Sequence, residues 1–174
     1  MSIYGYEIKN SFDFFKKLLD EREDYLKDPA SSRFALNVAL TAWHLHEWIF
    51  EEYKNLFISQ GLLKLEDFRN FLFQRCRELE NFRDLADGSK HFTLTRRDST
   101  ILKTELREAD SHWGFNKKLE TPTLIVVTTP ASIGMQITFD DLLYVVSFFW
   151  YSFFRSELSL KQEADALMQT YTFF

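Results

Sequence analysis

Four polar side chains share one face of the longest apolar helical stretch of the chain, residues 32–57. These side chains are Asn37, Thr41, His44 and Trp48, and their spacings of four, three and four residues place them along one side of a helix. A buried polar group without a hydrogen-bond partner costs about 1–3 kcal/mol, so this face needs partners from another element. Histidine titrates near neutral pH, so His44 could take part in acid–base chemistry or bind a polar ligand.

A second group of reactive side chains follows the predicted helix stop at Asp87 and Gly88. Lys90 and His91 lie in this turn, where side chains converge more freely than on a regular helix. If His91 faces the polar side of residues 32–57, two interpretations stay open. The cluster is either a general acid–base site with a cation on a phosphate, or a hydrogen-bonded cluster that fixes the turn on the helices. Buried, satisfied polar groups are commoner than active sites, which favours the structural interpretation.

Basic residues also gather after residue 83, and Arg96 is among them as a candidate ligand-binding residue. Acidic residues are interleaved with them, so the local excess of positive charge is slight. The whole chain carries a net charge of −5, whereas nucleic-acid-binding domains usually carry a basic surface. We find no glycine-rich phosphate loop and no nucleophile elbow.

Cysteine and histidine usage argues against disulfides, metals and cofactors. Cys76 is the single cysteine, so no intrachain disulfide and no cysteine zinc site can form. His44 and His46 are two positions apart and point to different sides of a helix. A site joining His44 to His91, with Asp84 or Asp87, is not demanded by their spacing. We therefore predict no metal and no cofactor, and the lack of a signal-peptide pattern at the N-terminus predicts a cytoplasmic protein.

Local signals predict the helices that carry these residues. Asn10 or Ser11 caps a first helix that ends near Lys27, and the second runs through residues 32–57 towards Gly61. A third is expected over residues 62–82. Its predicted inward side holds Leu65, Phe68, Leu72, Cys76 and Leu79, and its predicted solvated side holds Arg69, Arg75, Arg77, Glu78 and Glu80.

The residue pattern changes from helical to strand-like after residue 83. Alternating residues 92–95 predict the start of a strand, and residues 123–128 are a clear strand by their β-branched content. Residues 100–109 are ambiguous: their threonines and Ile101 favour a strand, the preferred interpretation, whereas Leu102, Leu106 and Ala109 suit a helix. Residues 135–137 return as a hairpin. Thr138 and Asp141 form a capping box for a last long helix over residues 139–156, which residues 162–169 extend.

These elements predict an α+β fold that is mainly α, with a small β-hairpin or sheet inserted before the last long helix. The chain is expected to be a single domain, residues 1–174. An up-down helical bundle occupies residues 10–90 and 139–169, and the β insertion occupies about residues 91–138. The apolar run of residues 142–154 is shorter than the roughly 20 residues that a helix needs to span a bilayer, so no membrane association is predicted.

Residues 32–91 resemble the HEPN (higher eukaryotes and prokaryotes nucleotide-binding) superfamily and small uncharacterised bacterial and phage proteins. The resemblance rests on an alanine-rich helix containing Trp-His-Leu, followed by Asp-x-x-x-Gly-x-Lys-His. It implies a metal-independent ribonuclease, or a non-catalytic relative that binds nucleotides or proteins, often dimeric and often in bacterial defence or toxin systems. Active members carry an arginine four to six residues before a histidine, whereas Arg83 precedes His91 by eight positions.

The leading hypothesis is a non-catalytic, HEPN-like interaction module that forms a homodimer or binds a protein partner through aromatic surface. The alternative is a metal-independent ribonuclease acting on RNA, with His91 as general acid or base and Arg83 or Lys90 on the scissile phosphate. A further alternative is a small-ligand sensor with a polar pocket in the bundle, formed by Asn37, Thr41, His44 and His91. The candidate ligand-binding residues are Asn37, Thr41, His44, Trp48 and Arg96.

Overall fold

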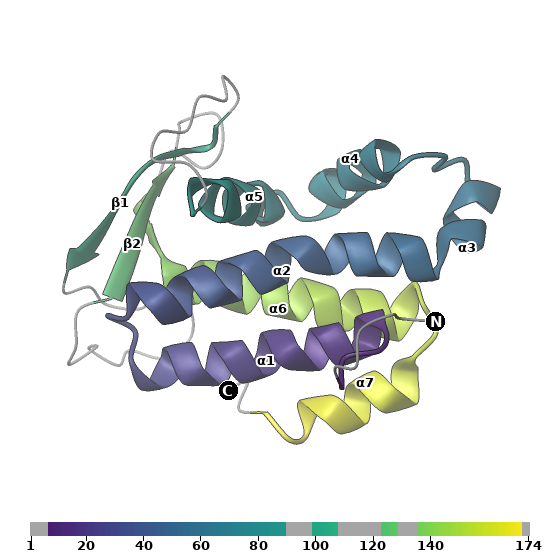
Figure 1. The fold of residues 1–174 in the computed structure, drawn as a ribbon, viewed down its shortest axis with the longest axis horizontal. Coiled ribbons are helices and arrows are strands. Elements are labelled where there is room, and N and C mark those ends of the chain that lie inside the picture. Colours follow the sequence, from purple (N-terminus) through teal and green to yellow (C-terminus); the bar gives the residue numbers. More distant parts are fainter. Residues whose placement is uncertain (1–6, 90–98, 108–122, 129–135, 172–174) are drawn as a thin grey trace.

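The computed structural model describes residues 7–89, 99–107, 123–128 and 136–171, and it confirms the predicted α+β, mainly α fold (Figure 1). A bundle of helices carries a small sheet at one end. The elements in chain order are α1 (Ser11–Lys27), α2 (Ser32–Glu52), α3 (Lys54–Ser59), α4 (Leu65–Arg75), α5 (Glu78–Gly88), β1 (Ile101–Arg107), β2 (Thr123–Thr128), β3 (Gln136–Thr138), α6 (Phe139–Ser156) and α7 (Lys161–Met168).

Helices α1 and α2 form the antiparallel pair predicted from their short connection (Figure 1). The Asn10 side chain caps α1 by accepting a hydrogen bond from the Asp13 backbone N–H at 2.7 Å. The Ser31 hydroxyl accepts the Phe34 N–H at 3.5 Å at the start of α2. Both caps satisfy backbone donors that a helix start leaves without partners. The pair presents the first turn of α1 beside the last turns of α2.

Helix α2 is the centre of the bundle, as its apolar girth predicts, and contacts α1, α5 and α6. Val38, Leu45 and Ile49 are completely buried on it. Trp150 of α6 is also completely buried, and its indole Nε1–H donates to the backbone carbonyl of Ala42 at 3.2 Å. This bond joins the middle of α6 to the middle of α2.

Two segments that were each predicted to form one helix are each divided in the structure. Neither break lies at a glycine or a proline, so no local signal in the sequence indicates it. Helix α2 ends at Glu52, and Tyr53, with φ −107° and ψ 23°, redirects the chain into α3 (Figure 1). The predicted helix over residues 62–82 is likewise two helices, since Cys76 is extended with φ −147° and ψ 95°. The breaks let the ring of Phe57 pack against that of Phe68, with centroids 4.4 Å apart, and the ring of Phe82 against that of Phe139, with centroids 5.6 Å apart. Ring packing between elements therefore outweighs local helix propensity here.

The sheet has the order β1-β2-β3, with both neighbouring pairs antiparallel. It confirms the strand expected over residues 100–109 and the hairpin of β2 and β3. Thr138 caps α6 by accepting the Asp141 N–H at 3.1 Å, as predicted. Helix α7 does not extend α6, because the chain turns at Ser159 with φ 59°. The strand predicted over residues 92–95 lies outside the described residues.

Within the described part of the chain, none of the helices combines the length and apolarity that a membrane span requires.

Candidate functional site

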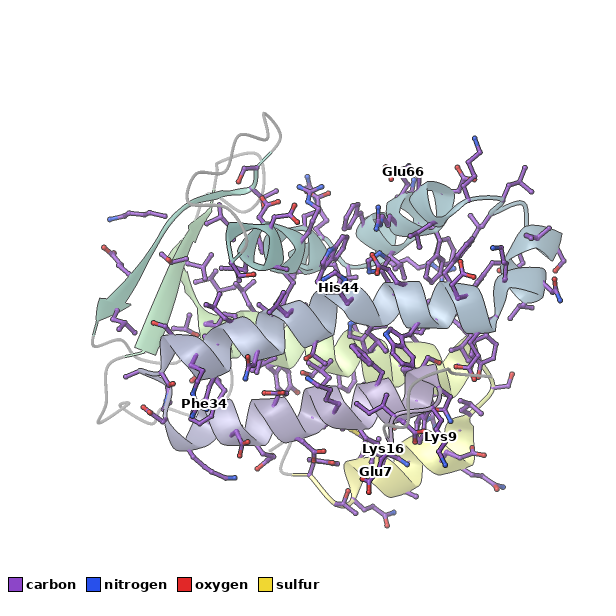
Figure 2. All side chains as sticks on the ribbon, in the orientation of Figure 1. Glu7, Lys9, Lys16, Phe34, His44 and Glu66 are labelled. Carbon is purple, nitrogen blue, oxygen red and sulfur yellow. The ribbon has the colours of Figure 1, made fainter. Side chains whose placement is uncertain are left out.

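Helix α1 contacts part of the polar face of α2. The Lys17 ammonium donates to the buried Thr41 hydroxyl at 2.7 Å, and the Trp48 indole stacks on Phe14 with ring centroids 4.8 Å apart. His44 lies midway along α2, half-buried, with Nδ1 3.3 Å from a Glu47 carboxylate oxygen (Figure 2). Asn37 is half-buried one turn before Thr41. Helix α1 therefore supplies partners for Thr41 and Trp48, whereas His44 meets Glu47 of its own helix.

Arg83 lies on α5, across α2 from α1 (Figure 1). Its side chain is only 11% exposed, its Nε–H donates to Asp84 at 3.0 Å, and its guanidinium lies 5.4 Å from the centre of the Phe73 ring. The structure does not bring Arg83 to the polar face that contacts α1. Lys90, His91 and Arg96 lie outside the described residues, so their convergence on that face stays a prediction.

Asp84 organises a buried polar cluster between α5 and the start of β1. Its Oδ2 accepts the Ser99 hydroxyl at 3.0 Å and the Thr100 backbone N–H. The Thr100 hydroxyl also donates to Asn81 Oδ1 at 2.7 Å. Hydrogen bonds to a carboxylate are stronger than neutral ones, so this cluster anchors the first strand on the bundle. Asn81 Nδ2 is buried and has no hydrogen-bond partner among the described residues.

A second buried network centres on His46, which is completely buried. Its Nδ1–H donates to the Trp43 carbonyl, and its Nε2 accepts the Arg69 Nε–H at 2.8 Å. A carbonyl only accepts and a guanidinium only donates, so the two contacts select the neutral tautomer protonated at Nδ1. Burial, reinforced by the Arg69 charge, lowers the pKa of His46 to about 4. His46 is therefore a neutral acceptor at physiological pH.

The prediction that Arg69 belongs to a solvated face is wrong. Besides its bond to His46, Arg69 donates from Nη2 to Glu47 Oε1 at 3.0 Å, and its guanidinium lies 5.6 Å from the Trp43 ring. Its side chain is 28% exposed. The pattern of α4 alone could not show this, because the contact is made by packing α4 against α2.

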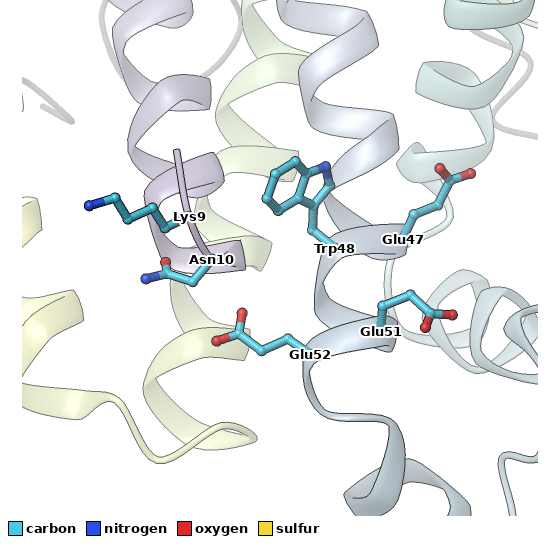
Figure 3. Close-up of a pocket in the computed structure, with 6 residues that line it drawn as sticks. All are labelled: Lys9, Asn10, Glu47, Trp48, Glu51 and Glu52. Carbon is cyan, nitrogen blue, oxygen red and sulfur yellow. The ribbon is translucent and has the colours of Figure 1, made fainter. Parts of the chain in front are cut away.

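A surface pocket lies between the start of α1 and the last turns of α2 (Figure 3). It has a volume of about 460 Å³. Its lining comprises three carboxylates, one ammonium, one amide and one indole, contributed by Glu47, Glu51, Glu52, Lys9, Asn10 and Trp48. Counting only these formal charges, the lining carries an excess of two negative charges. The pocket therefore suits a positively charged group.

Each carboxylate of this pocket is held differently. Glu52 reaches from α2 toward α1 and accepts both the backbone N–H and the hydroxyl of Ser11, at 2.7 and 2.6 Å (Figure 3). Glu47 pairs with Arg69. Glu51 is 69% exposed, and its pair with Lys54 at 3.5 Å is also exposed. Exposed pairs contribute about 0–1 kcal/mol, so Glu51 is the carboxylate most readily available to a ligand.

Sequence reasoning identified Trp48 of this lining and missed the others. The run of three glutamates beside Trp48, within two turns of the helix, is a local signal that could have indicated an anionic surface. Nothing local indicates that Lys9 and Asn10 face them.

The Cys76 thiol is buried in the core. Burial raises the pKa of the Cys76 thiol to about 12, which leaves it a protonated core residue. Across residues 7–89, 99–107, 123–128 and 136–171, no three histidine, cysteine or carboxylate side chains are grouped to hold a metal ion.

No family model, curated protein or solved structure matches this chain. Aromatic surface is present on α6, where Phe148 is 44% exposed beside Tyr144 and Tyr151. The predicted dimer stays a prediction.

Proposed function

We propose that this protein is a non-catalytic interaction module that binds an arginine or lysine side chain of a protein partner. The site is the pocket between α1 and α2. The observation that carries the proposal is the combination, in one surface pocket, of three glutamates with the indole of Trp48. The HEPN-like relationship remains a hypothesis about ancestry and is not needed for this proposal.

Charge supports a cationic ligand. The carboxylates of the lining outnumber its single ammonium, and the whole chain is acidic with a net charge of −5. A concave anionic site on an anionic protein concentrates positive ligands and speeds their association. The volume of about 460 Å³ falls within the roughly 300–1,000 Å³ of small-molecule sites and accommodates one long basic side chain.

Trp48 supplies the second element of recognition. Its ring is stacked on Phe14 at an interplanar angle of 21°, which holds the indole in one orientation. A cation over an indole gains about 0.5–2 kcal/mol, depending on how far it is desolvated. Because the indole is held before binding, little conformational entropy is lost when a ligand arrives.

Binding can be tested with acetyl-Gly-Arg-Gly-amide as the probe, measured by isothermal titration calorimetry. We expect saturable binding that weakens when salt is raised from about 20 to about 200 mM, because the attraction is largely electrostatic. Glu51→Gln should weaken binding by about threefold to fivefold, corresponding to an exposed charge pair of up to about 1 kcal/mol. Trp48→Leu should weaken it at least as much by removing the aromatic face.

Asp24→Asn is the matched control, because it removes the same charge from the opposite end of α1, where Asp24 is 51% exposed. It should leave binding of the probe unchanged, and acetyl-Gly-Gly-Gly-amide should not bind. The proposal fails if the wild-type protein shows no saturable binding, or if Asp24→Asn weakens binding as much as Glu51→Gln.

The ribonuclease alternative is less well supported. It needs Arg83 or Lys90 on the scissile phosphate, and the Arg83 side chain is 11% exposed with its Nε–H engaged by Asp84. We therefore expect no cleavage of several RNAs by the purified protein in EDTA. His91→Ala, at matched fold and concentration, is the comparison. Cleavage by the wild type that is lost in this variant would establish a metal-independent nuclease and overturn the non-catalytic proposal.

A further inference from the structure

We infer that Arg69 is a built-in competitor that occupies Glu47 and so limits how strongly the pocket binds a cation. This inference rests on the proposed function, because it concerns the same pocket. The inference is based on two simultaneous roles of the Glu47 side chain. It lines the pocket, and its Oε1 accepts the Arg69 Nη2–H at 3.0 Å.

Arg69 is positioned for this role by more than its bond to Glu47. Its Nε–H donates to His46 at 2.8 Å, its Nη1 lies 3.7 Å from Glu66, and its guanidinium covers Trp43. His46 has no proton on Nε2, so it can only accept at this position. A planar guanidinium that donates in several fixed directions is held in place better than a lysine ammonium would be.

Glu47 and Glu51 therefore differ although both line the pocket. The partner of Glu47 is anchored on a buried histidine, whereas the partner of Glu51 is Lys54, whose side chain is 49% exposed. The Glu47 and Glu51 carboxylates both turn away from Lys9 and Asn10 (Figure 3), and the Glu47 carboxylate meets Arg69 of α4. A ligand that pairs with Glu47 Oε1 competes with Arg69, whereas one that pairs with Glu51 competes only with the exposed Lys54.

We expect the contribution of Glu47 to binding of acetyl-Gly-Arg-Gly-amide, measured by calorimetry, to depend strongly on Arg69. Arg69→Gln should tighten binding by about fivefold, the effect of freeing one partly exposed carboxylate. Glu47→Gln should change wild-type binding by less than about twofold, because its charge is already neutralised there. When Glu47→Gln is added to Arg69→Gln, the affinity for the probe should return to that of the wild type.

Two further variants separate this competition from changes in net charge and from misfolding. Arg75→Gln removes the same charge from the last turn of α4, where Arg75 pairs with Glu157 at 2.7 Å, away from the pocket. It should leave binding unchanged. Arg69→Lys keeps the charge but cannot hold His46 and Glu47 together, so it should tighten binding by less than Arg69→Gln. Thermal melting by circular dichroism establishes that each variant is folded at the temperature of the titration.

The outcomes distinguish this inference from the proposed function. Wild-type binding that needs Glu51 and Trp48 but does not respond to Arg69→Gln overturns the competition and leaves the binding module standing. An equal gain in Arg75→Gln also overturns the competition. Binding only by Arg69→Gln, abolished by Glu47→Gln, supports the competition and refutes binding by the wild-type module. Absence of binding in wild type and Arg69→Gln alike overturns both.

Discussion

Replacing Trp150 with alanine is expected to lower the free energy of unfolding by about 3–5 kcal/mol, the range for truncating a large buried aromatic side chain. Trp150 is completely buried in α6 and packs against Phe149 and Phe153, with ring centroids 5.1 and 5.8 Å away. The substitution leaves a cavity between α6 and α2. It also removes the donor to the Ala42 carbonyl, a buried acceptor in the centre of the bundle.

Urea denaturation followed by far-ultraviolet circular dichroism measures this loss without depending on tryptophan fluorescence. Trp150→Phe is the matched control, because it keeps an aromatic ring and removes only the N–H and part of the volume. We expect it to lower the free energy of unfolding by about 0.5–1.5 kcal/mol, the net contribution of one hydrogen bond, because the Ala42 carbonyl keeps its bond within α2. A change below about 1 kcal/mol in Trp150→Ala would contradict the packing of α6 against α2.

Acidification is expected to destabilise the protein through His46. The folded-state pKa of His46 is lowered to about 4, chiefly by burial, whereas an unfolded chain has a histidine pKa of about 6.5. Between these two values the unfolded chain binds more protons. The contribution of His46 to stability is therefore complete above about pH 6.5, falls as the pH is lowered, and is lost by about pH 4. The total loss is about 3 kcal/mol.

Urea denaturation of the wild type and of His46→Gln at several pH values between about 7.5 and about 4.5 isolates this contribution from that of the carboxylates. Glutamine can donate to the Trp43 carbonyl and accept from Arg69 without titrating in this range. We expect the stability of His46→Gln to change much less with pH than that of the wild type. His44→Gln, a half-buried neighbour, is the control and should keep the wild-type dependence. If the stability of His46→Gln falls with pH as much as that of the wild type, His46 does not cause the loss of stability in acid.

Local chemistry was sufficient to predict most of the elements of this fold. The caps at Asn10, Ser31 and Thr138 lie where the sequence places them, because a side chain that caps a helix acts within three residues of its own position. The strand β2 follows from a run of β-branched residues, and the threonines and Ile101 favour the strand β1. The burial of α2 follows from its nearly continuous apolar surface.

The helix breaks at Tyr53 and Cys76 could not be predicted in the same way. Neither residue is a glycine or proline, and the segments on both sides keep helical periodicity. The breaks accompany contacts between rings far apart in the chain, such as Phe57 with Phe68. A periodic pattern states which residues face inward, and it does not state where the next helix lies.

Sequence patterns are enough to predict the class of the fold, its central helix and the polar character of one face of that helix, including Trp48. Which polar groups meet depends on how the helices pack. Arg69 reaches His46, 23 positions earlier, and Ser11 reaches Glu52, 41 positions later. These pairs exist because helices separated along the chain pack side by side, and hydrogen bonds form only between groups that packing brings within about 3 Å. The pocket beside Trp48 is a product of that packing.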